Sequence, residues 1–239
     1  MLLRLRNSFA SMTQAIRQQE RTANNLANVN TTGYKKERFF AETLNEFINA
    51  EGSPESTRNL RQWTDFSPGT LEPTGNTFDL AIDGEGLFTV TDPQGQTRFT
   101  RAGHFMLDAE GYLRMPNGFL VQGNNGPVQI PIGAKEVIIN DRGEIHVDGE
   151  LIDQLTIVWF ENPEMLERLD GTTFGAGTQT PIEIKTPHVR QGYLETANVN
   201  TMQEMTDMIA HFRLFETQQK VLQTQDQLLG RVTRELGKW

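Results

Sequence analysis

The four histidines are the side chains best suited to hold a transition metal or to move a proton near neutral pH. They are His104, His146, His188 and His211. No two of them share the HExxH spacing that places two imidazoles on one face of a helix. The chain also has no cysteine. We therefore expect no metal site, no thiolate catalysis and no disulfide.

Carboxylates and glycines near residue 84 suggest a second kind of chemistry. Gly84-Glu85-Gly86 lacks the third glycine of a dinucleotide-binding loop and precedes a strand-like run, so it predicts a turn without a cofactor. Asp79, Asp83 and Glu85 do not have the spacing of a calcium-binding loop. Carboxylates at turns could form the acid pair of a glycosidase, but the sequence gives neither their separation nor a cause for a raised pKa. We expect a protein that is not an enzyme and that binds no cofactor.

Charge is distributed unevenly along the chain and restricts the class of partner. The net charge is −9. Residues 1–34 carry four arginines against one glutamate, residues 198–239 carry five basic and five acidic side chains, and the excess of acid lies in residues 35–197. An acidic body does not fit nucleic acid as the main partner, because phosphate binding requires a basic surface. No apolar run reaches the roughly 18 residues of a membrane-spanning helix, and the N-terminus does not resemble a cleavable signal peptide.

Apolar stripes at the two ends of the chain predict two long helices. From Leu2 to Leu26, and again from Met205 to Leu236, mostly apolar side chains recur at alternating steps of three and four residues. Gln19 interrupts the first stripe, and Gln219, Asp226 and Thr233 interrupt the second. This spacing keeps them on one face of a helix, as in a coiled coil. Thr201 and Glu204 resemble a capping box that opens the second helix. We define the assembly seam as the expected contact residues: Leu5, Phe9, Met12, Ile16, Leu26, Met205, Met208, Phe212, Phe215, Leu222 and Leu229.

The middle of the chain has the alternation and the turns of an antiparallel β structure. Phe78, Leu80 and Ile82 alternate, and turn sequences such as Asn117-Gly118 and Asp148-Gly149 recur at intervals of roughly ten residues. We expect a mixed fold, with an all-β central body, a small antiparallel barrel or sandwich, flanked by helices that pair as a coiled coil. The expected parts are an N-terminal helix (1–34), a linker or irregular segment (35–76), a β-rich body (77–195) and a C-terminal helix (196–239). Within the linker, Phe40, Leu44, Phe47 and Ile48 suit a short amphipathic helix, and residues 51–62 suit an exposed loop.

Four sequence segments, in order, resemble the flagellar rod and hook protein family. They are residues 23–35 (ANNLANVNTTGYK), 78–90 (FDLAIDGEGLFTV), 99–113 (which opens FTRAGHF) and 192–200 (GYLETANVN). Residues 204–216 look most like the proximal-rod branch of the family, with the distal-rod protein next. We define the motif residues as Asn24, Asn25, Leu26, Ala27, Asn28, Thr31, Gly33, Asn198, Val199 and Asn200.

The resemblance implies a structural subunit of the rod in the flagellar basal body, which spans the periplasm. Its terminal helices would assemble with copies of itself and with other rod and hook subunits into a helical tube that transmits torque. The resemblance also implies export by the flagellar type III apparatus without a cleavable signal peptide. Two other hypotheses stay open at this point: a cell-wall glycosidase with helical ends, and another tube or adhesin subunit built on a coiled coil.

Overall fold

A computed structural model describes the backbone of residues 2–41 and 60–236. The chain divides into two compact units. We call Met1–Ala27 with Asn200–Trp239 the helical unit, and Asn28–Val199 the body. The structure is therefore mostly β, with one helix at each end of the chain.

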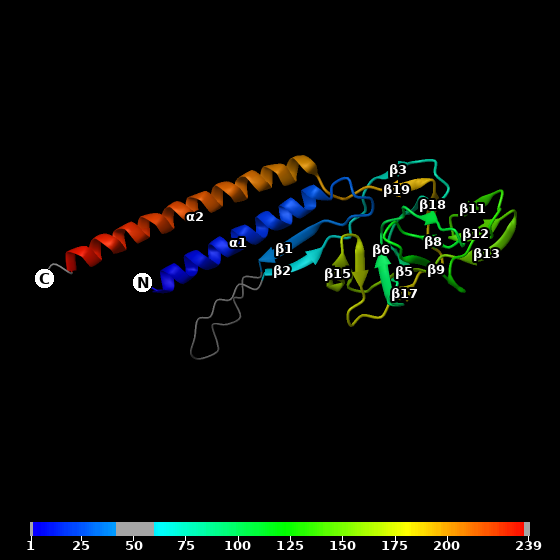
Figure 1. The fold of residues 1–239 in the computed structure, drawn as a ribbon, viewed down its shortest axis with the longest axis horizontal. Coiled ribbons are helices and arrows are strands. Elements are labelled where there is room, and N and C mark those ends of the chain that lie inside the picture. The colour runs from blue at the N-terminus through cyan, green and yellow to red at the C-terminus, as the bar shows by residue number, and fades with distance from the viewer. Residues whose placement is uncertain (1, 42–59, 237–239) are drawn as a thin grey trace. The chain divides into compact units, whose positions relative to one another are not determined.

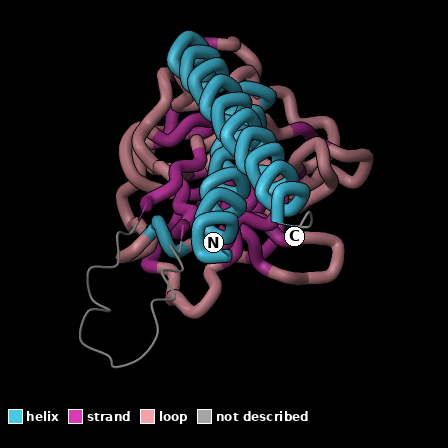
Figure 2. Tube along the Cα trace, turned by 90° about the vertical axis from the view of Figure 1, so that its left-hand side faces the viewer, coloured by secondary structure: helices cyan, strands magenta, loops and turns pink. Residues whose placement is uncertain are grey.

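The helical unit consists of α1 (Leu2–Ala27) and α2 (Thr201–Leu236), which lie side by side and run in opposite directions (Figures 1 and 2). The sequence of α1 contains neither glycine nor proline, the two residues that most disfavour a helix interior. The expected capping box is wrong in detail. Asn200 caps α2 because its side-chain Oδ1 accepts the Gln203 N–H at 3.1 Å, whereas Thr201 is the first residue of the helix.

The body is built from short strands in antiparallel pairs. In chain order they are β1 (Glu37–Ala41), β2 (Leu60–Thr64), β3 (Leu71–Pro73), β4 (Leu80–Ile82), β5 (Leu87–Thr91), β6 (Thr97–Thr100), β7 (Met106–Leu107), β8 (Leu113–Arg114), β9 (Leu120–Gly123), β10 (Gly126–Pro127), β11 (Val137–Ile139), β12 (Glu144–Val147), β13 (Glu150–Gln154), β14 (Ile157–Trp159), β15 (Glu167–Asp170), β16 (Thr173–Gly175), β17 (Ile182–Glu183), β18 (Val189–Gln191) and β19 (Tyr193–Glu195), with the 3-10 helix η2 (Pro163–Met165) between β14 and β15. The turns predicted from sequence are present. Asp148 and Gly149, with φ of 51° and 90°, join β12 to β13 in the geometry that an Asp-Gly hairpin favours.

The largest sheet follows the order β15-β16-β6-β5-β9-β8-β7, with β10, β14 and β17 attached at its sides. Three strands, β11, β12 and β13, form a separate sheet, and β1 pairs with β2. Two further pairs join early strands to late ones: β4 with β18, and β3 with β19. These two pairs bring residues 71–82 beside residues 189–195, and this closure positions the site described below.

The expected barrel is not formed in the described part of the chain. The path of the largest sheet ends at β15 on one side and at β7 on the other, and these two strands do not pair. Its strands are two to five residues long, too short to tilt and stagger into a closed ring.

The expected linker contains three strands within its described residues. Phe40 lies in β1, so the predicted short helix is wrong at that position, and Leu44, Phe47 and Ile48 lie outside the described residues. Of the predicted loop, residues 60–62 belong to β2, and the rest lies outside the described residues. β1 forms because it pairs with β2, a partner that begins 19 residues beyond its end and that local periodicity does not reveal.

Two apolar clusters fill the body, and β5 contributes to both. Successive side chains of a strand point to opposite faces. Leu87 accordingly joins the cluster that contains Phe99, Phe160 and Phe174, whereas Phe88 joins the cluster of the opposite side. That second cluster is the larger, and Phe88 meets Phe105 in it with a centroid distance of 5.3 Å. Each such side chain contributes about 1.5–3 kcal/mol by burial, so the body has a substantial core of its own.

Candidate functional site

Three charged side chains meet in the interior of the body. Lys35 is the last residue of the first family segment (23–35), which we call the first motif, Arg101 follows β6, and Glu195 is the last residue of β19. All three are almost completely buried. We call them the Glu195 cluster.

The Glu195 carboxylate receives donors from three parts of the chain. Its Oε1 accepts the Lys35 ammonium at 2.6 Å and the Gly69 N–H at 2.7 Å, and its Oε2 accepts the Arg101 Nε–H. The two cations also donate to backbone carbonyls. Lys35 donates to Ser67 at 2.8 Å, and Arg101 donates to the carbonyls that flank the turn between β4 and β5, including Ile82 at 2.6 Å. Buried charges of this kind are tolerated only when they are paired and hydrogen-bonded, as they are here.

The electrostatics of the cluster keep Glu195 ionised. Burial by itself raises the pKa of the Glu195 carboxyl, but Arg101 and Lys35 together outweigh burial and hold that pKa below its ordinary value. Burial lowers the pKa of the Lys35 ammonium, and the attraction of Glu195 offsets only part of this effect. One carboxylate therefore lies between two cations, and the arrangement suits a structural junction between chain segments.

Gly33 brings the first motif against this junction. Its N–H donates to the Glu195 carbonyl at 2.7 Å, and its φ of 67° lies in the left-handed region. A Cβ on Gly33 would lie 2.3 Å from the backbone nitrogen of Ala102, so no side chain fits there without movement of the backbone. The positive φ and the close approach to Ala102 are thus two separate reasons for glycine at this position.

Asn198 connects the last motif to the first in the same way. Its Oδ1 accepts the Lys36 N–H at 2.7 Å, and its Nδ2 donates to the Asp65 carbonyl at 2.8 Å and to the Ser67 carbonyl at 3.0 Å. One side chain therefore joins the segment after α1, the loop after β2 and the segment before α2. Those three segments are all part of the body.

The other motif residues have more varied surroundings. Asn28 ends the first helix region, since its carbonyl accepts the Thr31 N–H at 3.0 Å and its Oδ1 accepts the Thr31 hydroxyl at 3.2 Å. Asn25 is buried within the helical unit, where its Nδ2 donates to Glu204 Oε2 at 3.3 Å. The side chains of Asn24 and Ala27 are exposed, and those of Leu26 and Val199 are half-buried. The motif therefore has separate roles in the two units.

The side chains that α1 buries against α2 are small or polar. They are Ala15, Thr22 and Asn25, with Gln18 half-buried between them. In α2 the buried or half-buried face carries Glu204, Met208, His211, Phe215, Gln218 and Leu222. Both sets follow alternating steps of three and four residues.

The assembly seam is only partly on that face. Met12, Leu26, Met208, Phe215 and Leu222 are half-buried, whereas Ile16, Met205 and Phe212 are exposed. Leu5, Phe9 and Leu229 lie outside the described side chains.

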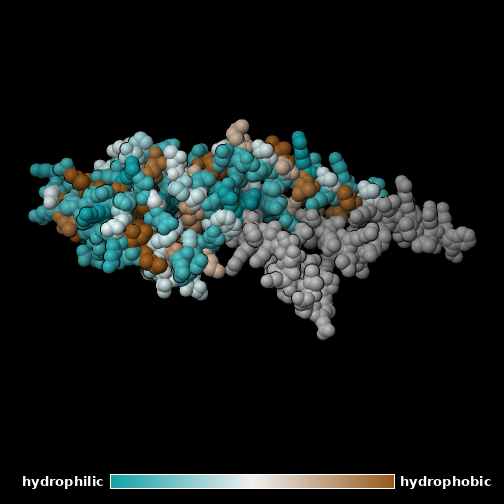
Figure 3. Space-filling view, turned by 180° about the vertical axis from the view of Figure 1, so that it is seen from behind, coloured by the Kyte–Doolittle hydropathy of each residue, from teal (hydrophilic) through white to brown (hydrophobic). Residues whose placement is uncertain are grey.

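Exposed apolar side chains of α2 form a second line at steps of three, four and three residues, which we call the outer stripe: Met202, Met205, Ile209 and Phe212. Apolar side chains at the surface are visible in Figure 3 among polar ones.

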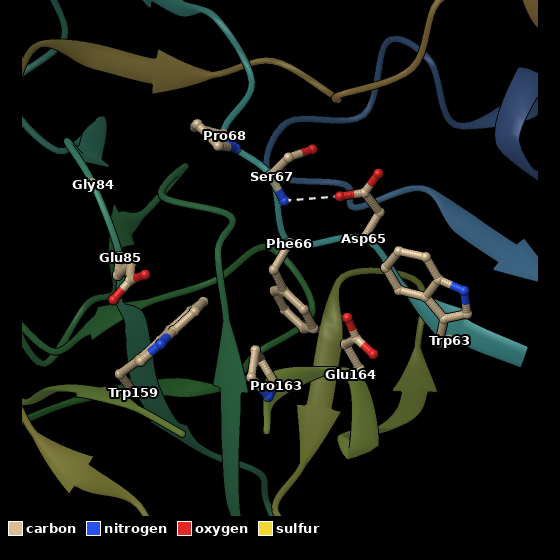
Figure 4. A pocket seen from close by; sticks show the side chains of 10 residues that line it. All are labelled: Trp63, Asp65, Phe66, Ser67, Pro68, Gly84, Glu85, Trp159, Pro163 and Glu164. Carbon is tan, nitrogen blue, oxygen red and sulfur yellow. Dashed lines mark hydrogen bonds between the residues drawn. The ribbon is translucent and has the colours of Figure 1, made fainter. Parts of the chain in front are cut away.

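A pocket of about 450 Å³ also lies in the body (Figure 4). Its walls include the aromatic rings of Trp63, Phe66 and Trp159, and Asp65 lies at its edge. The Asp65 carboxylate accepts the Ser67 N–H at 3.0 Å and pairs with Arg38 at 2.8 Å. Burial raises the pKa of Asp65, but these partners outweigh it and leave the pKa below its ordinary value. A glycosidase needs an acid with a raised pKa, so Asp65 does not support that hypothesis.

The sequence did not single out Lys35, Arg101 and Glu195. Each lies inside or next to one of the segments that carry the resemblance, surrounded by apolar or turn residues. A charged residue among apolar neighbours in such a segment could have indicated a buried ion pair, because a buried charge requires a partner. The sequence of one segment does not show which other segment supplies that partner.

No helix in the described part of the chain is both long and apolar enough to span a membrane.

Comparison with known protein families matches three consecutive parts of the chain. The family model described as flagella basal body rod protein matches residues 5–35, that of the flagellar hook protein FlgE/F/G D1 domain matches residues 81–147, and that of the flagellar basal body rod FlgEFG protein C-terminal matches residues 190–235. Each of these matches contains one member of the Glu195 cluster: Lys35 in the first, Arg101 in the second and Glu195 in the third.

Curated relatives extend the similarity over nearly the whole chain. The flagellar basal-body rod protein FlgG of Bacillus subtilis is 33% identical over 86% of this chain and 88% of its own length. FlgG of Agrobacterium fabrum is 32% identical, over 90% of this chain and 92% of its own. FlgF of Buchnera aphidicola is 28% identical, over 92% and 93%. The rod expectation is thereby confirmed, and a finer position within the rod stays a prediction. The chain belongs to the flagellar rod and hook family, as a structural subunit of the basal-body rod.

Proposed function

We propose that this chain polymerises through its helical unit into the tube of the rod, which transmits torque without turning over a substrate. In this proposal α1 and α2 pair as an antiparallel coiled coil within the subunit. Their contact residues follow the alternating spacing that such a pair requires, from Glu204 through Met208 and His211 to Leu222. Copies of the same chain and other rod and hook subunits are the expected partners.

The outer stripe is the observation that carries the proposal. Its four side chains remain exposed although α2 is already packed on α1 through another face. A regularly spaced apolar line of this kind fits the face of another helix. Contacts between different faces of identical subunits do not close on themselves, and they generate an open helical polymer.

The Glu195 cluster supports the mechanical part of the proposal. A subunit that transmits torque needs a firm connection between its body and the chain segments that lead to its helices. Lys35, Glu195 and Asn198 provide such contacts on both segments within the body. Export by the flagellar type III apparatus without a cleavable signal remains part of the proposal, and loss of secretion in cells that lack this apparatus would test it.

Substitution in the outer stripe tests polymerisation. Met205→Glu with Phe212→Glu places two charges on the stripe, and we expect loss of polymers in sedimentation and electron microscopy and loss of incorporation into basal bodies. Both side chains are exposed, at 46% and 49%, so the isolated subunit should keep its stability within about 0.5 kcal/mol per substitution. Leu214→Glu is the matched control, because Leu214 is 46% exposed and lies on a different side of α2.

The control variant should polymerise like the parent protein. Normal polymerisation of the doubly substituted chain would contradict the proposal. Equal loss in the control would show that polymerisation depends on the general surface of α2 and not on the outer stripe.

A further inference from the structure

A buried polar contact lies between α1 and α2. The Asn25 amide donates to a carboxyl oxygen of Glu204 at 3.3 Å, across 179 positions of sequence. The two residues are only 1% and 3% exposed. Each is therefore removed from water at a place where most helix pairs put apolar side chains.

The apolar contacts of α2 do not by themselves define one register. Met208, Phe215 and Leu222 are spaced by seven residues, so a slip of one heptad would replace each of them by a similar side chain. The outer stripe offers a further alternative, since Met202, Met205, Ile209 and Phe212 are more apolar than the Glu204, His211 and Gln218 positions of the inner face. On hydrophobic burial alone, the outer stripe would therefore compete with the inner face for α1 along residues 202–212.

The polar contact distinguishes these arrangements. After a slip of one heptad, Asn25 would lie at the level of His211 and lose Glu204, and with α1 on the outer stripe it would be buried against apolar side chains. A buried amide that loses its partner keeps the full cost of its desolvation. The native arrangement is the one that places the amide beside the carboxyl group.

We infer that Asn25 and Glu204 are specificity residues, which set the register of α1 on the inner face of α2 and so leave the outer stripe available to another chain. This inference concerns the pairing within one subunit. The register inference can be wrong even if the chain polymerises through the outer stripe. It can equally be right even if the chain does not polymerise.

Disulfide trapping in the full chain can test the register, because the chain has no cysteine of its own. Gln18 lies seven residues before Asn25 and His211 lies seven residues after Glu204, so in antiparallel helices they share one level and both are half-buried. Gln18→Cys with His211→Cys therefore reports the native register. Gln18→Cys with Gln218→Cys reports a slip of one heptad, and Gln18→Cys with Ile209→Cys reports α1 on the outer stripe.

In the otherwise unchanged chain, at a concentration that keeps it monomeric, we expect the native pair to cross-link at least about tenfold faster than the other two pairs. The decisive variant is Asn25→Leu with Glu204→Leu. It removes both buried polar groups together, so the helix pair should stay folded by circular dichroism, and its melting temperature should not fall. The advantage of the native cysteine pair should nevertheless drop to about threefold or less, because the arrangements then differ little in burial.

The exchange variant, Asn25→Glu with Glu204→Asn, restores a partner to both groups and should restore the native preference. A purely structural contribution of the contact would lower helix stability without changing which cysteines meet. The inference is overturned if the leucine variant keeps its full preference, if it loses its helices, or if the exchange variant does not recover the preference.

Discussion

The body and the helical unit bury opposite kinds of side chain. In the body, aromatic and aliphatic residues fill two clusters, and the buried charges of the Glu195 cluster are matched by close donors. In the helical unit, α1 buries Ala15, Thr22 and Asn25, whereas Met205, Ile209 and Phe212 of α2 face outward. The body thus contains what its own stability requires, and the helical unit keeps apolar surface unused within the subunit.

Removing the charge of Glu195 should produce the largest effect, and only in the body. Glu195→Gln leaves Lys35 and Arg101 buried without a counter-charge, and breaking a buried ion pair in this way costs about 3–5 kcal/mol. Urea unfolding followed by the fluorescence of Trp63 and Trp159, which lie in the body, measures the loss of unfolding free energy. Glu183→Gln, at an exposed position of β17, should change it by less than about 0.5 kcal/mol. A similar small change in both variants would refute the role given to the Glu195 cluster.

A side chain at Gly33 should have the next largest effect. Gly33→Ala combines a left-handed backbone with a clash against the backbone of Ala102, so we expect a loss of about 2–3 kcal/mol in the same unfolding measurement. Gly95→Ala is the matched control. Gly95 has a φ of 80°, but its Cβ would have open space, and about 1–2 kcal/mol should be lost. Equal losses at the two positions would show that backbone conformation, and not the close approach, accounts for Gly33.

A change of pH should have the smallest effect, and only in the helical unit. Burial and the neighbouring Arg21 lower the pKa of His211 from its ordinary 6.5, whereas Asp207 and Glu204 oppose them. The folded unit therefore favours the neutral ring, and the unfolded chain binds the proton more readily. Stability is complete above about pH 6.5 and is lost as the pH falls through that value, so the helix melting temperature should drop slightly between about pH 7.5 and pH 5.5. His211→Gln should remove this dependence in circular dichroism melts, and an unchanged pH dependence in that variant would assign the effect to another group.

Local features of the fold could be predicted from the sequence because their causes are local. The two helices follow from apolar spacing, and the Asp148-Gly149 hairpin follows from residues that accept a positive φ. The contact face of α1 was displaced by one position. The sequence pointed to Met12 and Ile16, but Ala15 and Thr22 are the buried residues. Small side chains allow two helices to approach closely, and a search for large apolar residues does not find them.

Tertiary pairing determined what the sequence could not reveal. Val128 and Ile130 alternate like strand residues and are buried, yet this segment forms an isolated bridge, between Tyr112 and Gln129, and single backbone hydrogen bonds to Gly111, Leu113 and Val121 in place of a strand of its own. The Glu195 cluster is the stronger case. Lys35 and Glu195 are 160 positions apart, and they meet because β3 and β4 pair with β19 and β18 near the other end of the body. The spacing of residues within one segment cannot indicate a contact between residues 160 positions apart.

The late position of Glu195 has a consequence during translation. A ribosome completes Lys35 and Arg101, together with β3 and β4, long before it reaches β18, β19 and the carboxylate that the two cations need. Until then the nascent chain cannot bury these charges in pairs, and hydration favours leaving them at the surface. The body can therefore complete its folding only after residue 195 has been synthesised. Until then the nascent chain cannot form the Glu195 cluster.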